Sequence, residues 1–323
     1  MTDKLGLVLL NMGGPDSLDA VEPFLYNLFS DRELIRLPGG AVLQKPFARL
    51  ISHFRSRHVR LLYQDIGGSS PLRRWTELQA EGIARHLGEA WTPFVAMRYW
   101  HPFAGESLAA MKRQGIRRAV VLSMYPHYTG ATTGSSVNDF RRQAASIHPE
   151  LEFSVIEQWY DWPPYLDALA SRIRQGLEQF HDLIRDEVRI LFSAHALPQK
   201  FIDRGDPYLE HVQTTVREVM KRVGHPHHAI GFQSRSGPVR WMEPDTIDVI
   251  KMFGEQGVPG LLVVPISFVS DHIETLHEID IQYRDLALES GIQHFHRAPS
   301  LNDGADFIAA MAELVRQHLG EQG

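Results

Sequence analysis

The stretch RILFSAHALP, residues 189–198, indicates the fold more clearly than any other part of the sequence. It starts as a short apolar run without alternating polar residues, and it leads directly into His195 and Pro198. Similar apolar runs occur at Leu7–Leu10, Ala119–Met124 and Leu261–Ile266, each followed by a loop rich in Gly, Pro or polar residues. Continuous runs of this length are typical of parallel strands buried on both faces. We therefore predict an α/β protein built from βαβ units.

Amphipathic segments between these runs predict the helices that cover the sheets. Their apolar residues recur at three- and four-residue spacing in Trp75–Leu87, Tyr165–Phe180, Tyr208–Val223 and Asp306–Leu319. The pattern occupies both halves of the chain, which a Trp- and Pro-rich connection at Gln158–Pro164 separates. We predict two Rossmann-like, doubly wound domains with parallel sheets, residues 1–158 and 159–323, and a cleft between them that holds the active site.

Composition excludes several classes of protein. The chain has 323 residues, a net charge of -6 and no long basic run, which argues against a general nucleic-acid-binding protein. It has no cysteine, so disulfides, thiolate metal sites and cysteine-bound iron–sulfur clusters are excluded. The apolar stretch Leu5–Leu10 is too short for a signal peptide, and no segment is long enough to span a membrane. We expect a cytoplasmic protein, with peripheral membrane contact left open.

His195 is the first candidate for chemistry, because ligands of open α/β sheets bind beyond the carboxyl ends of the strands. An ordinary core histidine, satisfied by its neighbours, is the alternative reading. The position of this residue does not by itself distinguish the two.

The fourth strand runs into SDHIETLHE, residues 270–278, where two histidines and two glutamates start a helix. Asp271 and Glu274 have the spacing of a capping box, which alone would explain both acids. Alternatively, Glu274, Glu278 and Gln282 share one helix face and form a hydrated path for protons or cations. Histidine and glutamate without cysteine suit a ferrous ion that is held weakly and passed on, rather than a closed zinc site.

Two glycine-containing loops complete the candidate sites. The loop Asn11–Pro15 follows a strand but lacks both nucleotide-binding fingerprints, so it makes either a simple turn or a close approach to a flat ligand. The loop Phe232–Pro244 has two prolines and a glycine, which predict an ordered, irregular segment. Trp241 in this loop either stacks on a flat ligand or packs in the interior.

Together these segments resemble the ferrochelatases over most of the chain. The resemblance rests on seven stretches that occur in order: LNMGGP at 10–15, IGGSSPL at 66–72, MRYWHP at 97–102, MYPHYTGATTGSS at 124–136, SAHALP at 193–198, FQSRSGPVRWMEP at 232–244 and FVSDHIETLHEID at 268–280.

The resemblance implies a function and a set of roles. It implies insertion of Fe²⁺ into protoporphyrin IX to form protohaem, with release of two protons, as the final step of haem biosynthesis. By similarity, His195 contacts the iron or accepts a pyrrole proton, Glu274 is its carboxylate partner across the macrocycle and contacts the iron as well, and Asp271, His272 and Glu278 support them. Fe²⁺ is then a substrate, no cofactor is tightly bound, and the last helix packs back on the N-terminal domain.

The same resemblance assigns residues that line the porphyrin or hold its propionates. These are Met12, Arg55, Tyr63, Arg98, Tyr99, Ser234 and Trp241. It also places the apolar segment Phe24–Pro38 at the lip of the cleft, where exposure would favour contact with a membrane or a partner, and core packing is the alternative. The oligomeric state is open, with a monomer favoured.

The chain departs from the family pattern at a few positions. Relatives with a [2Fe–2S] cluster use C-terminal cysteines, and this chain has none. Gln282 stands where some relatives have Glu, which leaves the outer end of the acidic path in doubt, and Met12 resembles members that use protoporphyrin IX rather than coproporphyrin III. The rival readings are a related chelatase that inserts Co²⁺ or Ni²⁺ into a precorrin-type ring, and a tetrapyrrole-binding module without turnover.

Overall fold

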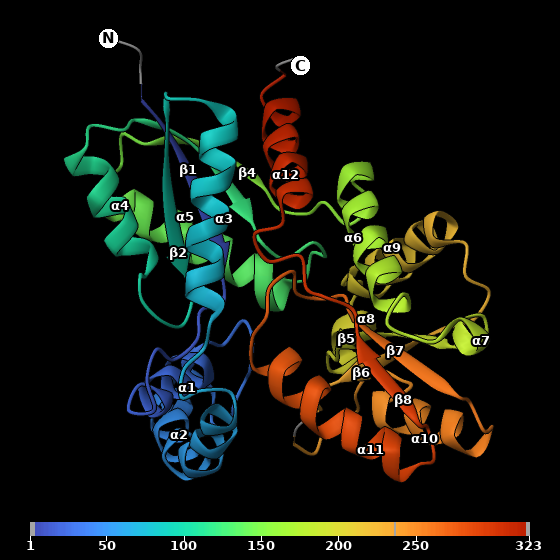
Figure 1. Cartoon of the computed structure of the whole chain (residues 1–323). Coiled ribbons are helices and arrows are strands. Elements are labelled where there is room, and N and C mark those ends of the chain that lie inside the picture. Colours follow the sequence, from blue (N-terminus) through green and yellow to red (C-terminus); the bar gives the residue numbers. More distant parts are fainter. Residues whose placement is uncertain (1–3, 236, 321–323) are drawn as a thin grey trace. The chain divides into compact units, whose positions relative to one another are not determined.

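The computed structural model describes residues 4–235 and 237–320, so Ser236, in one of the quoted stretches, lies outside the described residues. The chain divides into two compact units, Met1–Gln158 with Asn302–Gly323, and Trp159–Leu301. Each unit contains one four-stranded sheet with helices around it (Figure 1).

The sheet of the first unit is entirely parallel, with the strand order β2-β1-β3-β4. Leu7, Val8, Leu9 and Leu10 in the central strand are at most 1% exposed, because helices cover both faces of the sheet. The strands are β1 (Leu5–Asn11), β2 (Trp91–Met97), β3 (Arg118–Ser123) and β4 (Glu152–Ile156).

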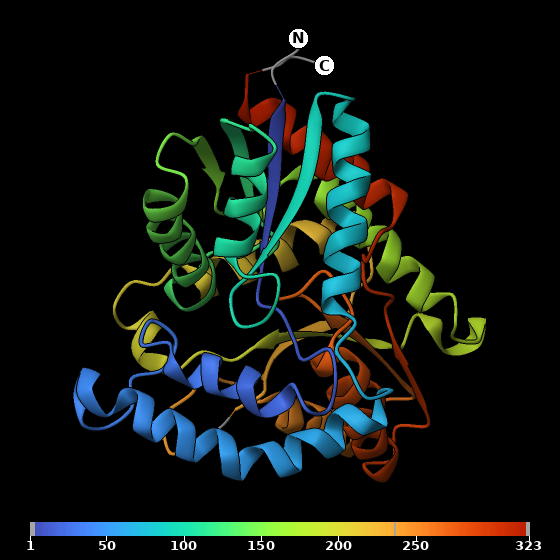
Figure 2. The same ribbon diagram turned by 90° about the vertical axis from the view of Figure 1, so that its left-hand side faces the viewer.

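Helices of the first unit flank its sheet, and a long helix pair lies beyond them. The helices are α1 (Val21–Ser30), α2 (Gly40–Asp65), α3 (Leu72–Leu87), α4 (Ala104–Arg113), the π-helix η1 (Gly130–Gly134), α5 (Ser135–Ile147) and α12 (Ala305–His318). Figure 2 shows α1 and α2 side by side. The last helix, α12, packs on α3, where Gly82 lets Ile308 approach so closely that a Cβ atom would lie 3.0 Å from it.

The second unit repeats this plan with the strand order β6-β5-β7-β8, again all parallel. Its strands are β5 (Arg189–His195), β6 (His228–Gln233), β7 (Gly260–Pro265) and β8 (His294–Arg297). Its helices are α6 (Pro163–Leu177), α7 (Asp182–Arg185), α8 (Gln199–Ile202), α9 (Tyr208–Val223), α10 (Thr246–Glu255), the π-helix η2 (Glu274–Tyr283) and α11 (Arg284–Glu289). The two parallel sheets confirm the predicted α/β, doubly wound class.

The strand order of each sheet indicates where a ligand is expected to bind. In each sheet the chain starts at a central strand, moves to one edge and then crosses to the other side, which creates a switch point at the carboxyl ends. In the second unit, His195 is the last residue of β5 and is in register with Gln233, the last residue of β6. The polar loops that follow β5, β6 and β7 therefore meet at one sheet edge.

The segment after β7 folds differently from the helix that the sequence predicts. Residues Glu274–Tyr283 form a ten-residue π-helix, a rare conformation that is frequent at functional sites. Asp271 does not cap it, because Ile273 is the capping residue and no side chain bonds there. The capping-box interpretation of Asp271 and Glu274 is therefore wrong.

Candidate active site

The backbone of His195 is held by hydrogen bonds from two neighbouring elements. Its N–H donates to Oγ of Ser267 at 2.8 Å, and its carbonyl accepts from the hydroxyl of Tyr208 at 2.9 Å. Tyr208 and Ser267 also bond to each other at 2.6 Å. The imidazole is thereby fixed at the strand end, with 35% of the side chain exposed.

His195 and Glu274 form an imidazole–carboxylate pair in direct contact, so the expectation that they lie on opposite sides of a macrocycle is wrong. Nδ1 of His195 lies 3.1 Å from both carboxylate oxygens of Glu274, whose side chain is 15% exposed. Burial acts to lower the pKa of His195, but the charge and hydrogen bond of Glu274 outweigh it and raise the pKa. Burial would raise the pKa of Glu274, yet the imidazole holds it well below its usual value. The pair therefore favours an ionised carboxylate beside a basic imidazole.

Glu278 lies one turn further along η2 in a different environment. It accepts hydrogen bonds from the backbone N–H of Ser234 at 3.0 Å, from its hydroxyl at 2.6 Å and from the hydroxyl of Tyr283 at 2.8 Å. Burial and the nearby charge of Glu274 raise the pKa of Glu278. The two acids thus differ in proton affinity, because the pKa of Glu274 is lowered and that of Glu278 is raised. Gln282, the third position of the predicted stripe, is exposed.

Gln233 is a member of this site that the sequence interpretation did not single out. Its side-chain amide donates to Glu274 at 3.1 Å and to Glu278 at 3.3 Å. Gln233 is 3% exposed and ends β6 directly beside His195. The available signal was its place at the carboxyl end of a strand, immediately before Ser234.

His272 lies beside the His195–Glu274 pair but makes no short hydrogen bond to either residue. Its Nδ1 is 3.0 Å from the carbonyl of Ser270, and its Nε2 is 3.8 Å from Oε2 of Glu274. Its ring packs on Phe268 with centroids 4.2 Å apart. The imidazole is buried and adds a second histidine around Glu274.

Asp271 faces Arg297 at the end of β8. Nη1 of Arg297 donates to Asp271 at 3.0 Å, and Ser300 donates to the same carboxylate at 2.7 Å. The guanidinium also makes a bidentate pair with Asp280 in η2, at 2.7 and 3.0 Å. Arg297 thus ties the segment before the π-helix to the π-helix itself.

Replacing Arg297 with methionine is expected to lower the free energy of unfolding by about 3 kcal/mol, because two carboxylates, one of them largely buried, lose their counter-charge. Urea denaturation measures the loss. Arg284→Met is the matched control, since the Arg284–Asp285 pair lies on the surface and a change within about 0.5 kcal/mol is expected there. Equal losses in both variants would contradict this assignment.

Five of the predicted porphyrin-binding residues belong to the first unit: Met12, Arg55, Tyr63, Arg98 and Tyr99. Met12 follows β1 and its carbonyl accepts from the N–H of Tyr99 at 2.9 Å. Tyr63 is buried in α2, and Arg55 is exposed on the same helix over the ring of Phe29.

Arg98 and Tyr99 converge on Asp31, a buried acid that the sequence interpretation missed. Asp31 accepts from Nη2 of Arg98 and from the hydroxyl of Tyr99, both at 2.9 Å, and also from Ser135. Nε of Arg98 donates to Ser135 at 2.8 Å. Burial and the charge of Asp31 raise the pKa of Tyr99. The group ties the end of α1 to the loop after β2 and the start of α5.

The other two predicted porphyrin-binding residues, Ser234 and Trp241, belong to the second unit. Ser234 is bonded to Glu278, as described above. Trp241 pairs with Pro198 in an isolated bridge, and the next residue, Met242, donates its N–H to Leu197 at 3.0 Å. The indole nitrogen of Trp241 is buried and has no hydrogen-bond partner among the residues that the structure describes.

No group of three or more His, Asp or Glu side chains in residues 4–235 and 237–320 is arranged to hold a metal ion. Within the same ranges, no helix is both long and apolar enough to cross a bilayer.

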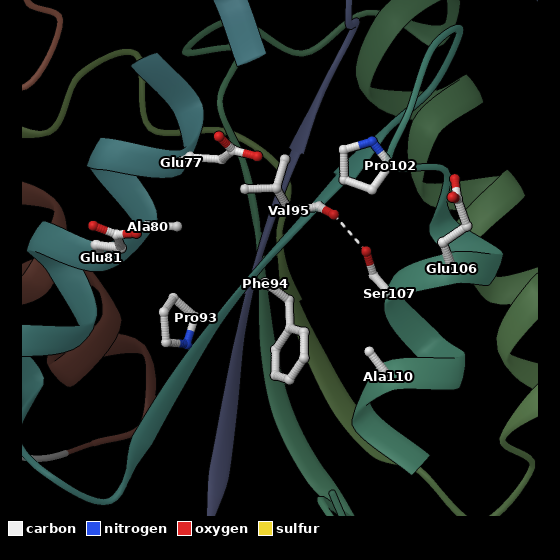
Figure 3. Close-up of a pocket in the computed structure, with 10 residues that line it drawn as sticks. All are labelled: Glu77, Ala80, Glu81, Pro93, Phe94, Val95, Pro102, Glu106, Ser107 and Ala110. Atoms are coloured by element: carbon white, nitrogen blue, oxygen red, sulfur yellow. Dashed lines mark hydrogen bonds between the residues drawn. The ribbon is translucent and has the colours of Figure 1, made fainter. Parts of the chain in front are cut away.

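A depression of about 330 Å³ lies in the first unit along the edge strand β2, between α3 and α4 (Figure 3). Pro93, Phe94 and Val95 form its floor, and the hydroxyl of Ser107 donates to the carbonyl of Val95 at 2.5 Å. None of the predicted site residues lines it.

Comparison with solved structures shows which known proteins share the fold. The sirohydrochlorin chelatase SirB from Bacillus subtilis subspecies spizizenii, solved in complex with cobalt, aligns over 97% of this chain and 94% of its own with a TM-score of 0.53. The sequences are 11% identical, so the likeness concerns the fold. The shared fold consists of two four-stranded parallel sheets, each with helices around it.

Sequence comparison gives the family. The family model Ferrochelatase matches residues 4–319. The ferrochelatase of Geotalea daltonii is 51% identical over 321 residues, which cover 99% of this chain and 100% of the relative. That of Geobacter metallireducens is 52% identical over 98% of this chain and 99% of its own length. The chain belongs to the ferrochelatase family.

Proposed function

We propose that the protein inserts Fe²⁺ into protoporphyrin IX and releases protohaem and two protons, as the final step of haem biosynthesis. The observation that carries this proposal is the His195–Glu274 pair at the carboxyl end of β5, in a chain of the ferrochelatase family. The iron keeps its oxidation state, so the reaction needs no electron donor.

The residues of the second unit supply the proton chemistry. Two pyrrole N–H bonds break as the nitrogens bind iron, so the site must accept two protons. Nδ1 of His195 is engaged by Glu274, which leaves Nε2 to face the macrocycle as a base whose pKa the carboxylate of Glu274 raises. Glu278, with its raised pKa, is suited to take up a proton passed on from this pair.

Fe²⁺ is a substrate in this proposal, and His195 and Glu274 are the residues that contact it. One imidazole and one carboxylate form an incomplete ligand set, which suits an ion that must be delivered. No resident cofactor is proposed, and the absence of cysteine excludes an iron–sulfur cluster bound by this chain's thiolates.

Porphyrin contact is proposed for Met12, Arg55, Tyr63, Arg98, Tyr99, Ser234 and Trp241, as the family resemblance implies. Trp241 is half-buried on a loop that bridges to Pro198, which supports an aromatic surface presented on an ordered loop. Met12 favours protoporphyrin IX over coproporphyrin III by the same resemblance.

The direct test is anaerobic incubation of the purified protein with protoporphyrin IX and Fe²⁺ while the visible spectrum is followed. The porphyrin spectrum is expected to be replaced by that of haem. Porphyrin binding without metal insertion would contradict the proposal and leave a tetrapyrrole-binding protein. Insertion of Co²⁺ into a precorrin-type ring alone would indicate the related chelatase.

We also propose that the protein works in the cytoplasm and touches a membrane through α2. The predicted lip segment Phe24–Pro38 is packed inward in its first part, where Phe24, Leu25 and Phe29 are at most 7% exposed. In its second part Leu34, Ile35 and Leu37 are half-buried. The exposed apolar surface lies on the next helix instead. Its most exposed members are Val42, Leu43, Leu50, Phe54 and Leu61.

The helix α2 differs from an ordinary surface helix, because small and polar side chains face the protein and large apolar side chains face outward. Its buried face carries Gln44, Ala48, Ser52 and Ser56, whereas Leu and Phe face outward. Its charged residues before Asp65 are all basic: Lys45, Arg49, Arg55, Arg57 and Arg60. An apolar stripe among cations is typical of helices that lie on anionic lipid.

Glutamate at Leu50 or Phe54 is expected to weaken binding to phosphatidylglycerol vesicles about tenfold each, because one exposed apolar side chain is worth about 1.5–3 kcal/mol on burial. Vesicle sedimentation measures the effect. Leu183→Glu is the control, since Leu183 is 83% exposed on α7 in the other unit and should have no influence. Unchanged binding in the α2 variants would contradict membrane contact through this helix.

A further inference from the structure

The side chain of Gln233 lies between Glu274 and Glu278, the two acids of the proposed proton chemistry. Its single amide nitrogen lies 3.1 Å from Oε2 of Glu274 and 3.3 Å from Oε2 of Glu278. One NH₂ group has two N–H donors, so it can serve both carboxylates at once. The two acids are therefore held within reach of each other by a neutral group between them.

The orientation of this amide is fixed from the other side. The hydroxyl of Ser193, on β5, donates to Oε1 of Gln233, and Ser193 is itself 3.2 Å from Oγ1 of Thr246 at the start of α10. Ser193, Gln233 and Thr246 are at most 3% exposed. If the amide were flipped, its oxygen would face two carboxylates and its NH₂ group would face Ser193, so the observed orientation satisfies more groups.

We infer that Gln233 is a positioning residue for iron insertion, which acts by holding Glu274 toward His195 and Glu278 toward Ser234 in one fixed arrangement. The inference rests on the proposed function. Its geometric basis is independent of that function, because the bridge joins three elements, β5, β6 and η2, through side chains buried in one unit. Ser193 acts only through Gln233, as the residue that orients its amide.

The bridge compensates for a weakness of the π-helix. A π-helix is a less favourable backbone than an α-helix, so side-chain contacts must hold its residues in place. Glu274 is the first residue of η2 and Glu278 lies within it. A donor from the rigid strand β6 ties both to the sheet that carries His195.

Gln233→Leu removes both donors with little change in volume, and a 10- to 100-fold fall in kcat is expected, as is usual when a partner of a reacting group is lost. The KM for protoporphyrin IX should stay within about twofold, because Gln233 acts on the acids rather than on the macrocycle. Gln79→Leu is the matched control. Gln79 is also fully buried and donates to the carbonyl of Asn302 at 2.7 Å in the other unit, so its loss should affect stability without changing kcat.

Ser193→Ala tests whether the orientation of the Gln233 amide matters for the rate, or only the packing of its side chain. The single change should lower kcat several-fold, because the amide is freed to turn. In the Gln233→Leu background it should have no further effect on kcat, since Ser193 acts through the amide alone. Additive losses in the double variant would overturn the inference, and so would a wild-type kcat in Gln233→Leu.

The experiment also distinguishes this inference from the proposed function. If the unmodified protein forms no haem, the proposed function fails before Gln233 is tested. In that case the bridge is tested by NMR, where the imidazole signals of His195 should shift in Gln233→Leu and not in Gln79→Leu. Haem formation by the unmodified protein with undiminished kcat in Gln233→Leu refutes the positioning role alone.

Discussion

Replacement of His195 by alanine is expected to reduce iron insertion about 1000-fold, within the range by which general bases accelerate reactions. Among the residues that the structure describes, His195 is the one imidazole that combines hydrogen bonds to its backbone at a strand end, a carboxylate at Nδ1 and a partly exposed ring. Alanine removes the proposed proton acceptor and iron contact together. The rate of haem formation with Fe²⁺ and protoporphyrin IX measures the loss.

Stability changes must be separated from this loss of chemistry. The hydrogen bonds of His195 that fix β5 come from its backbone, so alanine should keep the fold and the midpoint of unfolding close to that of the unmodified protein. His86→Ala, on the exposed part of α3, is the control and should retain full activity. A His195→Ala protein that keeps more than about a tenth of the rate would refute a role as proton acceptor.

Replacement of Glu274 by glutamine is expected to lower the rate about 100-fold and to change the titration of His195. Burial lowers the pKa of this imidazole. The carboxylate of Glu274, with a smaller contribution from the charge of Glu278, more than offsets the burial and raises the pKa. Without the charge, the pKa of His195 should fall, so the ring becomes neutral at a lower pH than in the unmodified protein. NMR titration of the imidazole signals measures the change directly.

The direction in which the pKa of His195 changes in Glu274→Gln decides whether the carboxylate of Glu274 controls this imidazole. Glutamine has nearly the shape of glutamate, so the contact with His195 survives while the charge is lost. A pKa of His195 that stays raised in Glu274→Gln would show that another group controls it. Glu77→Gln is the control, because Glu77 pairs with Arg73 on the surface of the other unit and should affect neither rate nor titration.

The sequence was sufficient to predict the parallel sheets, because their strands are buried on both faces and therefore appear as unbroken apolar runs. Leu7–Leu10 and the run that ends at His195 became β1 and β5 as predicted. The position of His195 at a strand end followed from the same argument. Glu274 and Glu278 were found together because they are close in sequence and share a helical face.

The hydrogen-bond partners of the predicted site residues could not be predicted, because these partners are distant in sequence and come together only when the chain folds. Gln233 meets Glu274 across 41 positions of sequence, and Arg98 meets Asp31 across 67. A buried glutamine and a loop aspartate look like surface residues when no partner is known. The π-helix was also missed, because spacing by four residues suits an α-helix equally well.

The placement of α12 has a consequence for how the protein is made. Residues 302–320 are translated after the whole of the second unit, yet they pack with the first unit, where α12 covers α3 and Gln79 donates to the carbonyl of Asn302. On the ribosome, the second unit emerges complete while the first still lacks its last helix. The part of α3 that α12 covers stays exposed during that interval, so the first unit can complete its packing only after the second unit has been synthesised.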